Sequence, residues 1–333
     1  MLNLDFKNKN LGIVKKFWIF VIVSAVIILA GLVDMLFIRH MNYGVEFSGG
    51  MSVEVTYDAS LDESKVNDVV DKYFATTSYK VDGEPQHSVA GGERTLTYRL
   101  KVEVKGSEGS QIEGDLTKAF GEKATELGDE RFDEIEVSSH TISNDVKNRI
   151  VRSAVIAVAV AVVVILVYIA IRFNLLAGVA AIIALVHDVL IMFALTTLFQ
   201  IPVNTTFIAA VITIIGYSIN ATIVVFDRVR ELIALPSYID KTDAEIAEDA
   251  VKGTMSRSIL TTLTTLVMIV CLAIFGNASI RDFAFPIIFG LVAGLYSSVL
   301  LSASTWVNLR KLFKQENKKP TKKIKKIKEQ AKA

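Results

Sequence analysis

The sequence predicts a polytopic α-helical membrane protein with six transmembrane helices and one α+β, ferredoxin-like extracytoplasmic domain between helices one and two. Three observations lead to this fold class. Six apolar runs are long enough to cross about 30 Å of hydrocarbon, a polar stretch of about 110 residues separates the first two runs, and charge is unevenly distributed. The polar stretch, residues 38–148, has 22 acidic against 12 basic residues, whereas residues 311–333 have 10 lysines and 2 glutamates. Such segregation indicates that the two segments face different compartments.

The apolar runs also predict the topology. They comprise residues 17–37, 153–171, 175–198, 205–226, 259–275 and 283–307, so that a five-helix region, 149–310, follows the extracytoplasmic domain. Lysine and arginine gather in residues 1–16, in the loop 227–258 and in the tail 311–333, which places both termini in the cytoplasm. The first run is about 20 residues long and no small-residue cleavage site follows it, so we expect a span rather than a signal peptide.

The polar stretch alternates between strand and helix patterns. We expect strands near residues 51–57, 78–90, 94–104 and 132–142, and helices near residues 61–74 and 111–127. The first strand alternates apolar and polar side chains with a period of two, which is typical of a half-buried strand. The first helix repeats apolar side chains along one face: Val66, Val69, Val70, Tyr73 and Phe74. The order β-α-β-β-α-β is that of a ferredoxin-like unit.

The cytoplasmic loop and the tail have different characters. Thr242 and Glu245 form a capping box, which predicts a short surface helix that runs to about Val251. The lysine-rich tail has too few apolar residues to pack a core. It is therefore solvated and disordered, or it is attracted to anionic lipid or to nucleic acid such as ribosomal RNA. The single cysteine, Cys271, excludes an intramolecular disulfide.

The third and fourth spans carry polar groups where lipid disfavours them. Asp188 lies within a few ångströms of the middle of the third span, where a charge costs about 2.5–3.5 kcal/mol on insertion scales. In the fourth span, one stripe with helical spacing is polar at four of its five positions: Thr213, Tyr217, Asn220, Val224 and Asp227. The stripe lies at the depth of Asp188, and Gly216 beside it permits close approach of the two helices. We therefore expect the stripe to be the partner of Asp188. The proton-relay candidates are Asp188 on the third span and four residues on the fourth span: Thr213, Tyr217, Asn220 and Thr222.

Two interpretations of Asp188 remain open. It is either a static group, kept protonated by desolvation and held by hydrogen bonds, or a carboxyl that gains and loses a proton during a conformational cycle. His187 points about 100° away around the helix, so the two side chains cannot face one partner. At the cytoplasmic edge, Asp227 and Arg228 form a charged motif that is either part of the switch or structural, in which case Asp227 pairs locally with Arg228 or Arg230. Arg228 lies about 18 Å from the midplane, which suits anchoring at the interface, and a direct pair with Asp188 would need a shifted span or intervening water.

Small and hydroxylated residues mark the remaining spans. The fifth span carries a hydroxyl face: Thr254, Ser258, Thr261 and Thr265. Such a face serves either as structural glue between helices or as part of a water wire. The sixth span has small residues four apart, which predict a helix-packing surface: Gly290, Gly294, Ser298 and Ser302. The second span lacks polar residues after Ser153, so we expect it to face lipid.

Patterns typical of an enzyme are missing from the sequence. It contains no metal-ligand cluster and no arrangement of a nucleophile with a base, and Gly49-Gly50 lacks the G-x-x-x-x-G-K frame of a nucleotide-binding loop. The sequence therefore predicts a protein that is not an enzyme and has no metal. Any work it performs must draw on a source other than ATP bound by this chain.

Three motifs make the sequence similar to a known family. Residues 42–50 read N-Y-G-V-E-F-S-G-G, residues 185–189 read L-V-H-D-V, and residues 215–231 read I-G-Y-S-I-N-A-T-I-V-V-F-D-R-V-R-E. Together these motifs resemble those of the SecF family, the smaller subunit of the SecDF accessory complex of the bacterial Sec translocase. This family lies within the resistance-nodulation-division superfamily. The resemblance covers nearly the whole chain.

Two positions depart from the family pattern. The family box after the first span, G-[IV]-D-F-x-G-G, corresponds to Gly44, Glu46, Phe47, Gly49 and Gly50. Glu46 thus replaces the usual Asp and keeps the charge. The fourth-span signature commonly has an acidic or amide residue after its Asn, whereas this chain has Ala221. If a proton route uses that side chain, the route is weaker here or is supplied elsewhere.

The resemblance implies a function at the bacterial cytoplasmic membrane. Members of this family pair with SecD and use the proton motive force to assist protein translocation. The implied partners are a SecD-like subunit in a pseudo-symmetric twelve-helix complex, the SecYEG translocon, SecA, the unfolded exported polypeptide and membrane lipids. Nucleic acid is not among the expected partners, and no cofactor is implied beyond protons as the coupling ion, with sodium as the other candidate. The alternatives are a proton-coupled small-molecule or lipid exporter and a passive translocon-stabilising scaffold.

Overall fold

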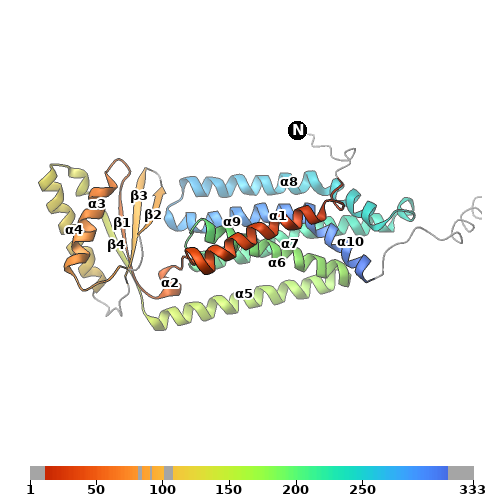
Figure 1. The fold of residues 1–333 in the computed structure, drawn as a ribbon, viewed down its shortest axis with the longest axis horizontal. Coiled ribbons are helices and arrows are strands. Elements are labelled where there is room, and N and C mark those ends of the chain that lie inside the picture. Colours follow the sequence, from red (N-terminus) through yellow and green to blue (C-terminus); the bar gives the residue numbers. More distant parts are fainter. Residues whose placement is uncertain (1–11, 82–84, 91, 101–107, 314–333) are drawn as a thin grey trace, which may run out of the picture.

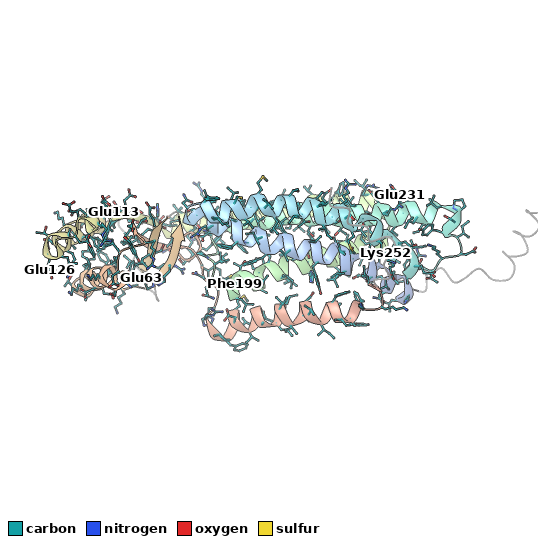
Figure 2. The ribbon with its side chains drawn as sticks, turned by 90° about the horizontal axis from the view of Figure 1, so that it is seen from above. Glu63, Glu113, Glu126, Phe199, Glu231 and Lys252 are labelled. Atoms are coloured by element: carbon teal, nitrogen blue, oxygen red, sulfur yellow. The ribbon has the colours of Figure 1, made fainter. Side chains whose placement is uncertain are left out.

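The protein is elongated, with a small α+β domain at one end of a helical bundle (Figure 1). The structure, a computed structural model, describes residues 12–81, 85–90, 92–100 and 108–313. Within this part of the chain, six helices are long and apolar enough to cross a membrane. Figure 2 places Phe199 at the end of the bundle nearest the α+β domain, and Glu231 and Lys252 at the opposite end, the distal end.

The membrane helices follow the predicted order. The first span is α1 (Phe17–Val33), which continues as the π-helix η1 (Asp34–Ile38). The next four are α5 (Asn144–Arg172), α6 (Leu175–Leu198), α7 (Thr205–Ala234) and α8 (Asp243–Phe275). The sixth consists of α9 (Ala278–Tyr296), the π-helix η4 (Ser297–Ser302) and α10 (Ala303–Leu312). The prediction of six transmembrane helices is confirmed. The predicted N-terminal segment up to residue 11 and the tail from residue 314 lie outside the described residues.

Burial divides the spans into inner and outer helices. Half of the most apolar stretch of α6 and of α7 is buried, against 6% of that of α5. The inner helices approach closely through small side chains such as Ala180, Ala181 and Ala184, which are almost fully buried. The helix α5 lies along the outside of the bundle (Figure 1). This exposure agrees with a second span that faces lipid.

The α+β domain is a four-stranded antiparallel sheet with two helices. Its elements are β1 (Gly50–Asp58), α3 (Glu63–Thr76), β2 (Gln86–Ala90), β3 (Glu93–Leu100), α4 (Glu108–Leu127) and β4 (Glu136–Ile142). The strands lie in the order β2-β3-β1-β4, with β1 paired to both β3 and β4. The predicted ferredoxin-like order is confirmed. The second strand begins at Gln86 rather than near residue 78, and the predicted end of the third strand, residues 101–104, lies outside the described residues.

The core of this domain lies between the sheet and its helices. Figure 1 shows α3 and α4 on the side of the sheet away from the bundle. Alternate residues of β1, such as Val53 and Val55, are fully buried against Val66 and Val70 of α3 and Phe120 of α4. Period-two burial on the strand and a helical stripe on α3 therefore meet in one apolar core.

One correction concerns the fifth span. The sequence predicts a short surface helix that ends near Val251 and a separate span, but α8 runs without a break from Asp243 to Phe275. Its capping box at Thr242 and Glu245 is present. The segment that follows the capping box is buried in the bundle, and Ile246 and Ala250 are almost fully covered. These contacts stabilise the helical conformation beyond the predicted end at Val251.

Candidate functional site

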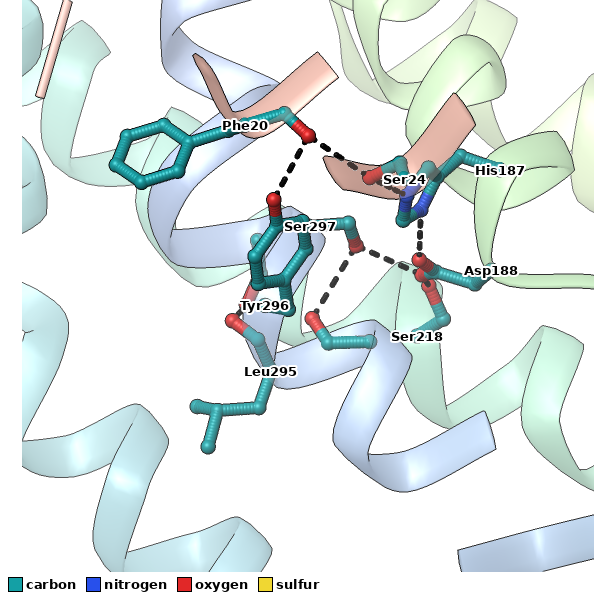
Figure 3. Close-up of polar contacts among 10 residues, drawn as sticks. Phe20, Ser24, His187, Asp188, Ser218, Leu295, Tyr296 and Ser297 are labelled. Atoms are coloured by element: carbon teal, nitrogen blue, oxygen red, sulfur yellow. Dashed lines mark hydrogen bonds and ion pairs between the residues drawn. The ribbon is translucent and has the colours of Figure 1, made fainter. Parts of the chain in front are cut away.

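Asp188 lies in the middle of α6 and is fully buried among the membrane helices. Its Oδ2 accepts hydrogen bonds from Ser218 Oγ on α7 and from Ser297 Oγ on η4, the latter at 2.8 Å (Figure 3). Its Oδ1 lies 2.8 Å from His187 Nδ1. Removing a carboxyl from water is costly unless its oxygens accept hydrogen bonds. These three partners, on three membrane helices, explain how the bundle accommodates it.

The π-helix η4 begins at the residue that contacts the carboxyl. Single π-turns shift the register of a helix and often occur at functional sites. Ser297 and Ser298 are both fully buried, whereas the predicted packing face of the sixth span contained only the second of them. Gly294, one turn earlier, lies beside the same carboxyl, because a Cβ there would be 3.6 Å from Asp188 Oδ2.

His187 connects the carboxyl to the first span. Its Nε2 lies 2.7 Å from Ser24 Oγ on α1. Ser24 Oγ donates to Phe20 O, which also accepts a 2.8 Å hydrogen bond from Tyr296 OH (Figure 3). The Tyr296 ring stacks on the imidazole with 6.0 Å between centroids. A neutral imidazole donates from one nitrogen and accepts at the other, whereas an imidazolium donates from both. A proton on His187 or on Asp188 therefore changes the bonds that join α1, α6 and the sixth span.

The predicted pairing of Asp188 with the polar stripe of α7 is wrong. Thr213 and Asn220 are exposed on the outside of the chain, and Thr213 Oγ1 donates to its own helix at Ala209 O. Tyr217 OH instead donates to Thr262 Oγ1 on α8 at 3.3 Å. The stripe has the right depth, but α7 is rotated so that a neighbouring face meets α6.

The inward face of α7 carries Ser218 and, one turn further, Thr222. Both side chains are buried, and Thr222 Oγ1 has no hydrogen-bond partner among the described residues. Of the four predicted relay residues on α7, Thr222 is thus the one on the face of Ser218. No pattern in the sequence marks Ser24, Ser218 or Ser297 as partners of Asp188. A hydroxyl inside an apolar span is a weak signal, because such groups usually bond to their own helix.

A second polar cluster lies at the distal end of the bundle. Asp227 accepts two hydrogen bonds from Arg172, the last residue of α5, at 2.5 and 2.6 Å. Arg230 Nη2 is 4.0 Å from Asp227 Oδ1, and Arg228 pairs with Glu231 at 2.8 Å. The predicted local pairing of Asp227 is therefore present with Arg230 but not with Arg228, and the closest partner, Arg172, comes from a different helix. Neither Asp227 nor Arg228 contacts Asp188.

The family-type box after the first span joins the α+β domain to the bundle. Glu46, in the short helix α2 (Val45–Ser48), accepts a hydrogen bond from Thr205 N with its Oε2 at 2.9 Å. Gly44 N donates to Val203 O, also at 2.9 Å. The first amides of a helix lack partners within that helix, and a carboxylate there is favoured by the helix dipole. The box is therefore bound to the start of α7.

The two glycines of the box form the connection to β1. Gly49 has φ +75° and Gly50 has φ +101°, a region that favours glycine. A Cβ on Gly50 would also lie 2.7 Å from Leu100 O of β3. Phe47 packs against apolar residues of the bundle around Phe207. One short segment thus contacts both parts of the molecule.

The glycines of the sixth span lie against α7. A Cβ on Gly290 would collide with the side chain of Ile214, and one on Gly294 would lie 3.5 Å from Ser218 Cβ. These contacts bring α9 close enough for η4 to reach Asp188. Across the described ranges, no group of three or more His, Cys, Asp or Glu side chains is placed to hold a metal ion.

Two protein-family models match the chain. The model described as "Protein export membrane protein SecD/SecF, C-terminal" matches residues 123–312. The model described as "SecD/SecF GG Motif" matches residues 35–60, which include the box bound to α7. The two models cover the last five membrane spans and the connection between the first span and β1, whereas α1 lies outside both matches.

Curated relatives and solved structures show the same similarity. A protein translocase subunit SecF from Calditerrivibrio nitroreducens is 30% identical over 92% of this chain and 97% of its own length. Another, from Alicyclobacillus acidocaldarius, is 33% identical over 88% of this chain and 90% of its own length. The crystal structure of SecDF from Thermus thermophilus matches 92% of this chain with a TM-score of 0.67 and 27% identity. A structure of SecDF in a super-membrane-facing form matches 95% with a TM-score of 0.55 and 26% identity. This chain spans 39% and 40% of those two SecDF chains.

Proposed function

The chain belongs to the SecD/SecF family of protein export membrane proteins, and from this premise we propose that it is a SecF-type accessory subunit of the Sec translocase. In this role it assists protein translocation across the bacterial cytoplasmic membrane and uses the proton motive force. Its termini face the cytoplasm, and its role is accessory rather than catalytic. The observation that carries the proposal is Asp188, a fully buried carboxyl in mid-span whose partners lie on three membrane helices.

Protonation of Asp188 changes what it can bind. As a carboxylate it only accepts hydrogen bonds, and Ser218, Ser297 and His187 supply three. As a carboxylic acid it must also donate one, so at least one partner has to turn. A proton that crosses 100 mV supplies about 2.3 kcal/mol, enough to change the ratio of two bundle conformations roughly fiftyfold.

The helix α7 connects this switch to the α+β domain. Ser218 in the middle of α7 contacts Asp188, and Thr205 at its start is bound to Glu46 of the box. The box leads directly into β1 through Gly49 and Gly50. A displacement of α7 therefore reaches the central strand of the sheet through few intermediate contacts, and the α+β domain would act on the emerging polypeptide.

A SecD-like subunit is the partner that suits the outward face of the chain. Thr213, Gly216 and Asn220 on α7 and Thr264 on α8 are exposed at membrane depth. Lipid tails cannot satisfy an exposed amide, whereas a neighbouring helix can, and Gly216 has open space around it. A homologous subunit on this face would complete a pseudo-symmetric twelve-helix complex. SecYEG, SecA and the unfolded exported polypeptide are the further partners that this role requires.

Protons are the proposed coupling ion, with sodium as the other candidate. Ala221 has no polar side chain, so a proton that leaves Asp188 toward the distal, cytoplasmic side must use other groups. Thr222 is the nearest such group on the inward face of α7, since its buried Oγ1 has no partner among the described residues. A water molecule next to Thr222 and Ser218 would complete a short relay to the carboxyl.

The test is the Asp188→Asn variant, reconstituted with SecD, SecYEG and SecA in membrane vesicles. We expect normal insertion and partner binding but loss of the part of translocation that a protonophore abolishes. The matched control is Asp227→Asn at the distal end. It makes the same chemical change away from the hydrogen bonds of Asp188 and should retain the protonophore-sensitive part of translocation. Gradient-dependent export that is undiminished in Asp188→Asn would overturn the mechanism. In that case, loss of both SecD co-purification and translocation in Gly216→Leu, on the outward face of α7, would indicate a scaffold. Substrate-dependent proton flux would indicate a small-molecule or lipid exporter.

A further inference from the structure

A cavity of about 620 Å³ lies at the distal end of the bundle. It is bounded by the end of α5, the start of α6, the end of α7 and α10. Several of its apolar lining residues are strongly exposed, with Leu175 at 81% and Leu312 at 73%, so the cavity is open to the surroundings. Its volume is within the range of pockets that hold small ligands. The established contacts of Asp188 do not involve it.

The cavity has an excess of positive charge. Its lining contains three arginines and one carboxylate, a net charge of +2: Arg172, Arg230, Arg310 and Asp227. Two of the guanidinium groups have close partners, because Arg172 binds Asp227 and Arg310 lies 2.9 Å from Asp243. Arg230 differs from them. Its side chain is 65% exposed and is 4.0 Å from a carboxylate that Arg172 already binds. The charge of Arg230 is therefore available to an anion at the rim.

An apolar track continues from the cavity along α6. It consists of exposed side chains with helical spacing: Leu175, Val179, Ile183, Val186 and Leu190. The first two also line the cavity. Trp306 of α10 also lines the cavity, with the Arg310 guanidinium 5.1 Å from its ring centroid, and tryptophan is enriched at the level of lipid headgroups. An anion site at the edge and a hydrocarbon track beneath it match the two parts of one phospholipid.

We propose that this cavity binds one anionic phospholipid from the leaflet at the distal end. Its phosphate contacts Arg230 at the rim, and one acyl chain follows the track on α6. A basic pocket between membrane helices is the usual type of site for an anionic headgroup. The lysine-rich segment 314–333 follows directly, but its charge has the same sign as that of the cavity and makes it an unsuitable occupant. The lipid would connect the outlying helix α5 to α6 and α7.

The experiment is native mass spectrometry of the full chain, purified in detergent and exposed to equal amounts of phosphatidylglycerol and phosphatidylcholine. The wild type should retain one phosphatidylglycerol in preference to phosphatidylcholine. In Arg230→Gln the bound fraction should fall about tenfold, the effect of losing one charge-assisted hydrogen bond. The matched control is Arg228→Gln, which removes the same charge from the same helix outside the cavity and should retain the lipid.

Three results would overturn the proposal. The first is equal retention of phosphatidylglycerol by Arg230→Gln and Arg228→Gln. The second is displacement of the lipid by millimolar inorganic phosphate, which would show that the cavity recognises a free anion rather than a phospholipid. The third is loss of the lipid when the SecD partner is co-purified, which would assign the cavity to a protein contact. This inference goes beyond the proposed function, because lipid retention is measured without any translocation.

Discussion

The α+β domain and the helical bundle place their polar groups in opposite ways. In the α+β domain the fully buried side chains are mostly apolar, such as Val53, Leu96 and Phe120, and the charges lie outside. In the bundle, apolar side chains such as Trp18 and Ile171 are exposed, whereas Asp188 is fully buried at the centre. In water, burial of apolar side chains is favourable, which explains the apolar core of the α+β domain. In lipid, apolar side chains are as stable on the surface of the bundle as inside it.

The contrast separates stability from function. In the α+β domain the apolar interior stabilises the fold, so a polar substitution there should cause unfolding. In the bundle, close packing of small residues keeps the helices together. The buried hydrogen bonds around Asp188 are therefore not needed for that purpose and can change with protonation. Equivalent substitutions in the two interiors should therefore have different consequences.

The largest effect is expected for Val53→Asn in the core of the α+β domain. The change removes apolar contacts and buries an amide without partners, which should lower the free energy of unfolding by about 3–5 kcal/mol. The measurement is the urea midpoint of the domain within the full chain, followed by limited proteolysis. Thr56→Asn, on the half-exposed opposite face of β1, is the matched control and should cost far less. Equal midpoints for the two variants would contradict an apolar core between sheet and helices.

An intermediate effect is expected for Gly290→Leu in the bundle. The new side chain would collide with Ile214, and such overpacking costs about 1–3 kcal/mol. Gly216→Leu makes the same change on the open face of α7 and should leave the melting temperature of the isolated chain unaltered. It should instead reduce co-purification with SecD. If Gly216→Leu lowers the melting temperature as much as Gly290→Leu, the outward face of α7 is packed as closely as its inward face.

Most of the fold could be predicted from the sequence because both regions follow simple periodic patterns. Long apolar runs mark the six spans, and period-two alternation next to a helical stripe marks the sheet and α3. The continuous helix α8 could not be predicted, since its extension depends on the burial of Ile246 and Ala250 by other helices. The local pattern of apolar residues in the sequence does not indicate that packing.

The site was predictable in its centre but not in its surroundings. Asp188 is identified by depth alone, because few carboxyls occur in mid-membrane. Its partners depend on two features that the sequence does not reveal. The rotation of α7 presents Ser218 rather than Tyr217, and the π-turn at Ser297 shifts the register of the sixth span. Depth follows from counting residues, whereas rotation about a helix axis is decided by tertiary contacts.

The smallest effect on stability is expected for Ser297→Ala, which removes one of the donors to Asp188. Hydrogen bonds between membrane helices contribute about 0.6 kcal/mol on average, so the melting temperature should barely change. Gradient-dependent translocation should nevertheless fall roughly threefold, because the same energy now biases the two protonation states of the switch.

The matched control is Ser302→Ala, one turn further along the sixth span. Ser302 is equally buried, but its Oγ donates to Ser298 O and does not contact Asp188. The two variants thus remove the same atom from similar surroundings and differ only in whether the carboxyl loses a partner. If both reduce translocation to the same extent, buried hydroxyls of the sixth span serve packing alone, and the bundle interior resembles that of the α+β domain in being structural. If only Ser297→Ala does so, the polar interior of the bundle is functional.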